Sequence, residues 1–181
     1  MIIKQKLENK IEILKNENNI KKINNFNNET LDILLKKYNL TNSDDKRMMK
    51  QELRRIYSAS VEKYCNLKLI SKPSIDKNIT ITEKCHIISF EHLFKNRKYK
   101  EAISPFNVLF LNPDLHKFYD NNYLTFNPLE QKIELTELGR NKDDISYYND
   151  KKINVNNLQL EFIEKNYNII KKRVVIHNEK N

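Results

Sequence analysis

Apolar residues recur every three or four positions in about the first 40 residues, a spacing that predicts helices. One stripe runs from Ile3 to Leu14, and residues 30–38 predict a second short helix. Between them, residues 16–28 are rich in Asn and Lys and predict a loop or a frayed helix. We interpret residues 1–42 as an accessory helical segment. It either packs its apolar stripe on the core, which is the commoner use of such a face, or contacts a partner.

A second amphipathic pattern predicts a helix over residues 43–64. Asn42 or Ser43 can cap its first turn, and the acidic pair that follows suits a helix N-terminus. The residues expected on its buried face are Met49, Leu53, Ile56, Tyr57, Val61 and Tyr64. The rest of its surface is basic, which fits a phosphate contact, although a solvated face is the commoner explanation.

From residue 65 onwards the texture of the sequence changes to short β-branched runs and turn signals. Strands are expected at 67–71 and 79–88 with a turn at 72–74, and a polar loop is expected at 89–105. The apolar run at 107–111 predicts a short buried strand.

The remaining pattern predicts a short helix, a hairpin and a last helix. Asn112 is a capping residue and Pro113 fits the first helical position, so a helix should run to about Asp120. The later elements are a hairpin at 123–126 and 132–135, a polar loop at 139–152 and a helix at 158–172. The expected fold class is α+β.

Charge and composition suggest a polyanion as the first partner to consider. The chain has 181 residues, enough for one compact domain with appendages, and a formal net charge of +9. Asn and Lys occur 27 times each, against six Arg. Such an excess is typical of an AT-rich genome, so it weakens any argument based on one Lys or Asn.

Several protein classes are excluded by what the sequence lacks. No apolar run approaches the ~18 residues of a membrane span, and charges interrupt the start of the chain, so no secretory signal is expected. Two cysteines are too few for a disulfide framework or a four-thiolate zinc site. The single glycine, Gly139, excludes Gly-rich phosphate loops. We therefore expect a cytoplasmic protein with no membrane partner.

Four residues on three predicted elements supply the candidate chemistry. His86 lies near the end of a predicted strand, Asn107 begins the next strand, and His116 and Asp120 lie in the helix after it. Residues four apart project from one helical face, so His116 and Asp120 can share one cation. Because histidine occurs only four times in the chain, this spacing is more specific than any pattern of Asn or Lys.

This order of residues resembles the HNH nucleases, in particular the branch common among bacterial restriction endonucleases. The resemblance is carried by residues 85–88 (CHII), 107–111 (NVLFL), 112–120 (NPDLHKFYD) and 123–126 (YLTF), and with weaker upstream likeness covers about 48–127. It implies a ββα-metal (HNH) finger flanked by N-terminal helices and by a C-terminal β-hairpin plus helix. The domains are then the accessory segment, a nuclease core at 43–138, and a C-terminal loop and helix at 139–181.

The resemblance also implies roles for the four residues. His86 matches the general base, since a neutral imidazole can take a proton from water at neutral pH. His116 and Asp120 would hold one divalent ion, and Asn107 would hold His86 in orientation. Mg²⁺ or Mn²⁺ is expected, with Zn²⁺ as the alternative, because imidazole and carboxylate together suit Mn²⁺ or Zn²⁺ somewhat better than Mg²⁺.

One position departs from the family pattern. Many HNH fingers have Asp or His directly before the base as a metal ligand, and here that residue is Cys85. A thiolate is a poor partner for Mg²⁺. We interpret Cys85 as a small buried core residue. The alternative is that another acid, Glu83 or Asp114, contributes to the metal site.

The expected substrate is double-stranded DNA. Lys95, Arg97, Lys98 and Lys100 lie in the segment between base and Asn, where phosphate contact and a bland solvated loop are equally good explanations. The implied activity is hydrolysis of phosphodiester bonds by a one-metal mechanism, as in a type II restriction endonuclease. Residues 1–47 and 128–181 are then the candidates for base contacts or dimerisation, a palindrome would require a homodimer, and a DNA methyltransferase is the expected companion. The alternatives are a non-specific toxin or repair nuclease, and a non-cleaving DNA-binding module.

Overall fold

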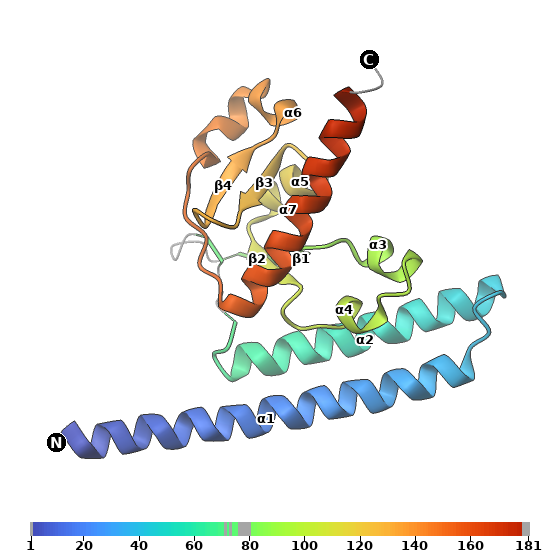
Figure 1. Cartoon of the computed structure of the whole chain (residues 1–181), viewed down its shortest axis with the longest axis vertical. Coiled ribbons are helices and arrows are strands. Elements are labelled where there is room, and N and C mark those ends of the chain that lie inside the picture. The colour runs from blue at the N-terminus through green and yellow to red at the C-terminus, as the bar shows by residue number, and fades with distance from the viewer. Residues whose placement is uncertain (1, 71, 73, 76–80, 179–181) are drawn as a thin grey trace.

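Two long antiparallel helices form one side of the molecule, and the rest of the chain packs against the second of them (Figure 1). The computed structural model describes the backbone of residues 2–70, 72, 74–75 and 81–178, and the side chains of 17–70, 72, 74–75 and 81–170. The fold is α+β, as predicted. Among the described residues, no helix has both the length and the apolar character that crossing a membrane requires.

Helix α1 (Ile2–Lys37) is continuous, so the loop or frayed helix predicted at 16–28 is wrong. The apolar pattern continues through this stretch, where Ile20 and Ile23 pack against the core. Asn27 is buried and its Nδ2 donates to Ser60 Oγ of α2 at 2.8 Å. Packing on α2 thus outweighs the weak helix propensity of Asn. The side chains of the predicted stripe from Ile3 to Leu14 lie outside the described residues.

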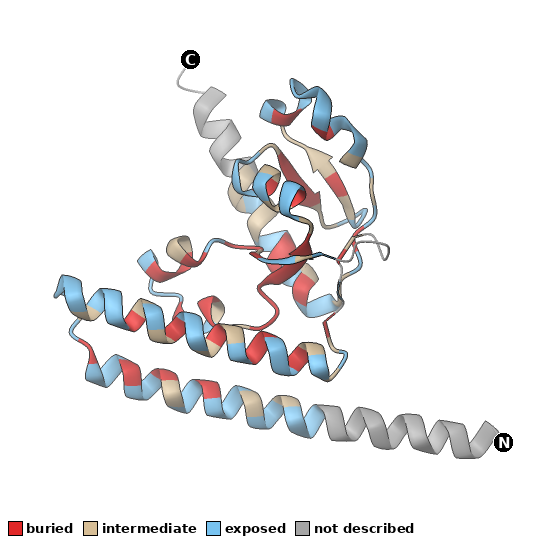
Figure 2. Cartoon of the chain, turned by 180° about the vertical axis from the view of Figure 1, so that it is seen from behind, coloured by how far each residue is buried: buried red, intermediate tan, exposed pale blue. Residues whose placement is uncertain are grey.

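Helix α2 (Ser43–Asn66) agrees closely with its prediction. Asn42 is the N-cap, and its Oδ1 accepts from the backbone N–H of Asp44 and of Asp45 at 2.8 and 3.4 Å. The expected face is buried except for Ile56, which is half-buried. Figure 2 shows buried residues on the sides of α1 and α2 that face each other and the rest of the fold.

The strands β1 (Glu83–His86) and β2 (Val108–Leu111) pair antiparallel and form the first two-stranded sheet, here called the first hairpin. The strand predicted at 79–88 is therefore shorter, and its positions 79–80 lie outside the described residues. The strand predicted at 67–71 is wrong over 67–70, since Leu69 donates its N–H to the carbonyl of Tyr64 and extends the end of α2 as a turn.

The segment predicted as a polar loop at 89–105 contains two short helices, α3 (Phe90–Lys95) and α4 (Tyr99–Ala102). Their apolar residues are spaced at helical intervals and are buried, so packing decides their conformation. Helix α5 (Pro113–Asp120) begins as predicted, because Asn112 Oδ1 accepts from Leu115 N at 2.8 Å and Pro113 occupies the first turn.

The second hairpin, β3 (Leu124–Asn127) and β4 (Lys132–Leu135), matches its prediction. The following segment is not wholly a loop, since it contains α6 (Glu137–Arg140) and the 3₁₀ helix η1 (Asp143–Tyr148). Helix α7 (Asn157–Asn178) then crosses both hairpins (Figure 1). Its buried Gln159 donates from Nε2 to Val108 O at 2.7 Å and so anchors β2.

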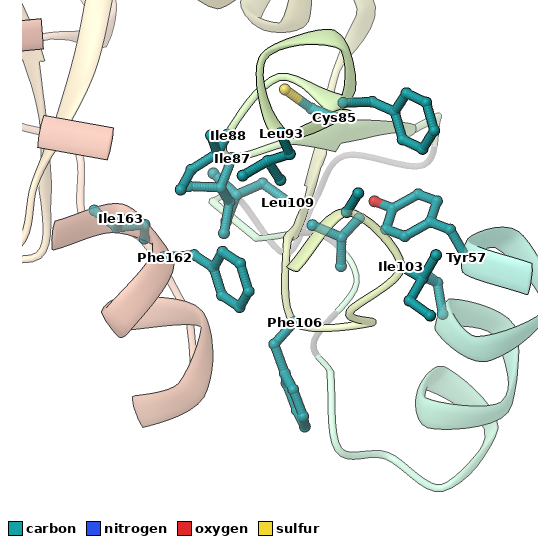
Figure 3. Packing of buried hydrophobic residues seen from close by; sticks show 14 of the residues in the cluster. Tyr57, Cys85, Ile87, Ile88, Leu93, Ile103, Phe106, Leu109, Phe162 and Ile163 are labelled. Carbon is teal, nitrogen blue, oxygen red and sulfur yellow. The ribbon is translucent and has the colours of Figure 1, made fainter. Parts of the chain in front are cut away.

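One hydrophobic core joins these parts. Figure 3 shows Tyr57 of α2, Leu109 of β2 and Phe162 of α7 entering it from different elements. All four residues of β2 are buried. The site-bearing hairpin is therefore fixed by packing from α2 on one side and α7 on the other.

Gly139 offers a test of this packing at the β3–α6 junction. A Cβ at this position would lie 1.8 Å from the carbonyl oxygen of Tyr123, a backbone atom that cannot swing away. We expect Gly139→Ala to lower the free energy of unfolding by about 1–3 kcal/mol, measured by urea denaturation. The neighbouring exposed Leu138 is the control, and Leu138→Ala should change it by less than about 0.5 kcal/mol. Equal stability of the two variants would contradict this packing.

Candidate active site

A cavity of about 370 Å³ opens between β1, α3, α5 and α7, and three of the predicted residues line it. They are His86 from the end of β1 and His116 and Asp120 from α5. Arg54 and Lys84 line the same cavity and make its wall partly cationic. The strand residue His86 and the helical pair His116 and Asp120 therefore lie at one cavity, as the sequence predicts.

His86 is half-buried between aromatic rings. Its imidazole stacks on Tyr57 with ring centroids 4.2 Å apart and an angle of 22°, and it meets the edge of Phe90. Burial, followed by the electrostatic effects of Arg54, His116 and Lys84, lowers the pKa of His86 from 6.5 to about 4. At neutral pH the ring is therefore uncharged.

The Nε2 atom of His86 is buried and has no hydrogen-bond partner among the described residues. Buried polar atoms are normally paired, and an unpaired one is costly. A neutral imidazole has one nitrogen with a free lone pair, and that nitrogen can take a proton.

Asn107 is fully buried and closes the loop that follows His86. Its Oδ1 accepts from Ile88 N at 2.8 Å and its Nδ2 donates to Ile88 O at 3.0 Å. The carbonyl of Asn107 accepts from Tyr57 Oη at 3.1 Å. Asn107 therefore connects the chain just after His86, through its side chain, to the Tyr57 ring that stacks on His86, through its backbone carbonyl. This double contact is also why the strand ends before Ile88.

The carboxylates of Glu83 and Asp120 contact opposite nitrogens of His116. Nδ1 lies 2.8 Å from Glu83 Oε2, and Nε2 lies 3.4 Å from Asp120 Oδ2. Glu83 and Cys85 alternate with Lys84 along β1 and so share a face of the strand. Cys85 Sγ, a ring nitrogen of His116 and a carboxylate oxygen of Asp120 all lie within 4.8 Å of one another.

Cys85 is fully buried, as its interpretation as a core residue requires, but it also belongs to this cluster. Burial raises the pKa of its thiol well above the usual range, and the charges of Asp120 and Glu83 add to the effect. Asp114, the other acid considered as a ligand, is exposed at the start of α5 and is not in the cluster found among the described side chains.

The donor set of this cluster fits a divalent cation. Ligand atoms ~2.1 Å from a tetrahedral ion lie about 3.4 Å apart, which is the observed separation of His116 Nε2 from Asp120 Oδ2. A carboxylate on the other ring nitrogen, here Glu83, is the usual partner of a metal-binding histidine.

The four predicted DNA contacts are all exposed, but the structure separates them into two pairs. Lys95 and Arg97 line a second cavity of about 380 Å³ together with Lys46 and Lys50 of α2. Lys98 and Lys100 do not line it.

The sequence did not identify Tyr57, Arg54 or Lys84 as site residues. Helical spacing puts Tyr57 on the buried face of α2 and Arg54 on the rest of its surface, but spacing alone does not show that either residue lies near His86. Arg54 is directed by Glu91 of α3, whose Oε1 lies 3.0 Å from Arg54 Nη2. This contact spans 37 positions of the chain, so no local signal predicts it.

The depressed pKa of His86 predicts a pH dependence of stability. His86 binds a proton near pH 6.5 in the unfolded chain and only near pH 4 in the folded chain. Its contribution to the free energy of unfolding is therefore fully present above pH 6.5 and is lost as the pH falls towards 4. This loss amounts to about 3 kcal/mol. We expect His86→Phe, which keeps a ring on Tyr57, to lack that component in urea unfolding between pH 7 and pH 4. If wild type and variant lost the same stability, the imidazole would not be the group responsible.

A comparison with known families identifies the segment that contains this cavity. Residues 65–127 match the family model described as HNH endonuclease. The match begins at the last two residues of α2, so the likeness proposed for residues 48–64 lies outside it, and it ends with β3. No curated protein matches the chain. The matched segment contains β1, β2, α5 and all four residues of the predicted constellation. Residues 65–127 are therefore an HNH endonuclease domain.

Proposed function

We propose that the protein is a metal-dependent DNA endonuclease that uses His86 as general base and His116 with Asp120 as metal ligands. The observation that carries this proposal is the neutral, unpaired imidazole of His86 beside the His116–Asp120 donor pair on one cavity. A proton acceptor and a cation site in one polar cavity are what hydrolysis of a phosphodiester requires.

The residues that line the cavity have different proposed roles according to their charge. His86 takes the proton of the attacking water, because its lowered pKa keeps the ring in the neutral, proton-accepting form at neutral pH. Arg54 and Lys84 attract the phosphate into the cavity. His116 and Asp120 would hold a divalent ion, which would polarise the phosphate as a Lewis acid and stabilise the departing oxygen. Mg²⁺ and Mn²⁺ are the first candidates, with Zn²⁺ as the alternative.

Asn107 is proposed to act on His86 by positioning and not by contact with substrate. Its two hydrogen bonds to Ile88 fix the chain two residues after the base. Tyr57 shares this task, because its ring stacks on His86 while its hydroxyl group donates to the Asn107 carbonyl. Precise placement of a base relative to the attacked atom contributes much of the rate of such reactions.

We further propose a type II restriction role for this nuclease. The finger occupies about a third of the chain, so residues 1–47, with α1, and residues 128–181, with β4 and α7, remain to read sequence and to dimerise. Phe26, Ile33 and Leu35 on α1 are exposed apolar residues, which suits a second copy of the chain. A palindrome cutter of this kind needs a companion DNA methyltransferase to protect the host DNA.

Cleavage of plasmid DNA tests the assignment of the base and of the ligands. Wild type should cut with Mg²⁺, Mn²⁺ or Zn²⁺ and stop with EDTA, and His86→Ala should cut at least about 100-fold more slowly. Asp120→Asn should also lose activity, whereas the matched change Asp114→Asn on the same helix should not. Cutting by His86→Ala at the wild-type rate would remove the base assignment.

The pattern of products separates the restriction role from its alternatives. Discrete fragments support a restriction enzyme, whereas a smear indicates a non-specific nuclease. A gel shift without cutting under any of these ions indicates a DNA-binding module.

The salt dependence of DNA binding tests whether the second cavity, which Lys95 and Arg97 line, contacts phosphate. If Lys95 and Arg97 each contact one phosphate, changing both to Ala should reduce the slope of log K against log salt concentration by about 1.8. Lys63→Ala is the control, because Lys63 lies over the ring of Phe26 on α1, and it should leave the slope unchanged. An unchanged slope in the double variant would assign these side chains to solvent. Fluorescence anisotropy with a labelled duplex measures the slope.

A further inference from the structure

We propose that Cys85 is a third protein ligand at the metal centre and that its thiolate makes the centre select a thiophilic divalent cation such as Zn²⁺ over Mg²⁺. This inference rests on the proposed function, because it concerns the ion held by His116 and Asp120. It replaces the interpretation of Cys85 as a core residue alone and commits the identity of the metal to one chemical class.

The first support is the convergence of three different donors from two elements. Cys85 comes from β1, and His116 and Asp120 come from one face of α5. Their Sγ, N and O atoms lie within 4.8 Å of one another. Small side-chain movements bring such a set onto one ion, because donors on a tetrahedral ion lie about 3.4–3.8 Å apart.

The second support is the arrangement around His116. The Glu83 carboxylate lies 2.8 Å from Nδ1 of His116, where it can accept an N–H from that nitrogen and leave Nε2 for a cation. Nε2 then presents a lone pair to the Asp120 carboxylate, 3.4 Å away. The triad of carboxylate, histidine and metal is a recurrent feature of zinc sites.

The third support is the character of the sulfur site. Cys85 is fully buried, yet the groups beside it include the carboxylates of Glu83 and Asp120. A cation compensates this negative charge, and on binding the S–H bond is replaced by an S–metal bond while the proton leaves to solvent. One carboxylate, one imidazole and one thiolate suit Zn²⁺, whereas Mg²⁺ requires six hard oxygen ligands in an octahedron.

The consequence for the site is a coordination sphere with one open position. Three protein donors approach from β1 and α5, and His116 and Asp120 also line the cavity that contains His86. Catalytic zinc sites have this form, with three protein ligands and a fourth position for water or substrate.

Cobalt spectroscopy on the full-length protein tests thiolate ligation without measuring activity. Metal-free protein, kept free of thiol reagents, is titrated with Co²⁺, which takes the place of Zn²⁺ and reports a thiolate ligand by a sulfur-to-metal charge-transfer band in the near ultraviolet. We expect this band to saturate at one equivalent in the wild type and in Cys65→Ser. Cys65 is the matched control, because it lies at the end of α2 and outside the cluster.

Exchange of Cys85 tests the selectivity. Cys85→Ser should lose the band and bind Zn²⁺ more than about tenfold more weakly in calorimetry, since loss of an outer-shell partner alone costs about 10–100-fold. Its Mg²⁺ affinity should change by less than about threefold. Cys85→Asp should shift the preference towards Mg²⁺ and Mn²⁺.

The outcomes separate this inference from the proposed function. A one-equivalent Co²⁺ complex of wild type without the band would overturn thiolate ligation and leave the metal-dependent nuclease standing. This measurement needs no Cys85 variant, so it remains decisive if Cys85→Ser fails to fold. Wild type that binds no divalent ion would overturn both proposals. A band that persists in Cys85→Ser and disappears in Cys65→Ser would identify Cys65 as the sulfur ligand and would also overturn the inference.

Discussion

The two hydrogen bonds between the Asn107 side chain and the backbone of Ile88 are the contact on which the site depends. Both partners are buried, so loss of the amide would leave an unpaired donor and an unpaired acceptor in the core. The bonds end β1 directly after His86 and bring the carbonyl of Asn107 to the Tyr57 hydroxyl group. The orientation of the imidazole thus follows from one interaction between the start of β2 and the loop after β1.

Charge is arranged in opposite senses around the cavity. Arg54 and Lys84 lie towards His86, and together with burial they keep the imidazole neutral. Glu83 and Asp120 lie around His116 and Cys85, where they favour a bound cation. The proposed proton acceptor and the proposed cation site have contrary electrostatic needs. The short strand β1 contributes residues to both, because Glu83 and Cys85 project from one face while His86 follows on the other.

Large parts of the fold could be predicted because they depend on local signals. The cap at Asn42, the cap and proline at 112–113 and the hairpin around residue 128 are set by residues next to each other in the chain. Predictions failed where distant packing decides the conformation. The Asn-rich stretch at 16–28 is helical because it lies on α2, and the 89–105 segment forms two helices because its apolar residues reach the core.

The candidate site divides in the same way. The sequence by itself singled out His86, Asn107, His116 and Asp120 as candidates, through a rare residue type, an i, i+4 spacing and the likeness to the HNH pattern. Only the tertiary structure decided that Tyr57 stacks on His86, that Arg54 lines the cavity, and that Cys85 and Glu83 converge on His116. The physical reason is that these contacts join elements about 30 or more positions apart, and their geometry is fixed by how the elements pack and not by any spacing within one of them.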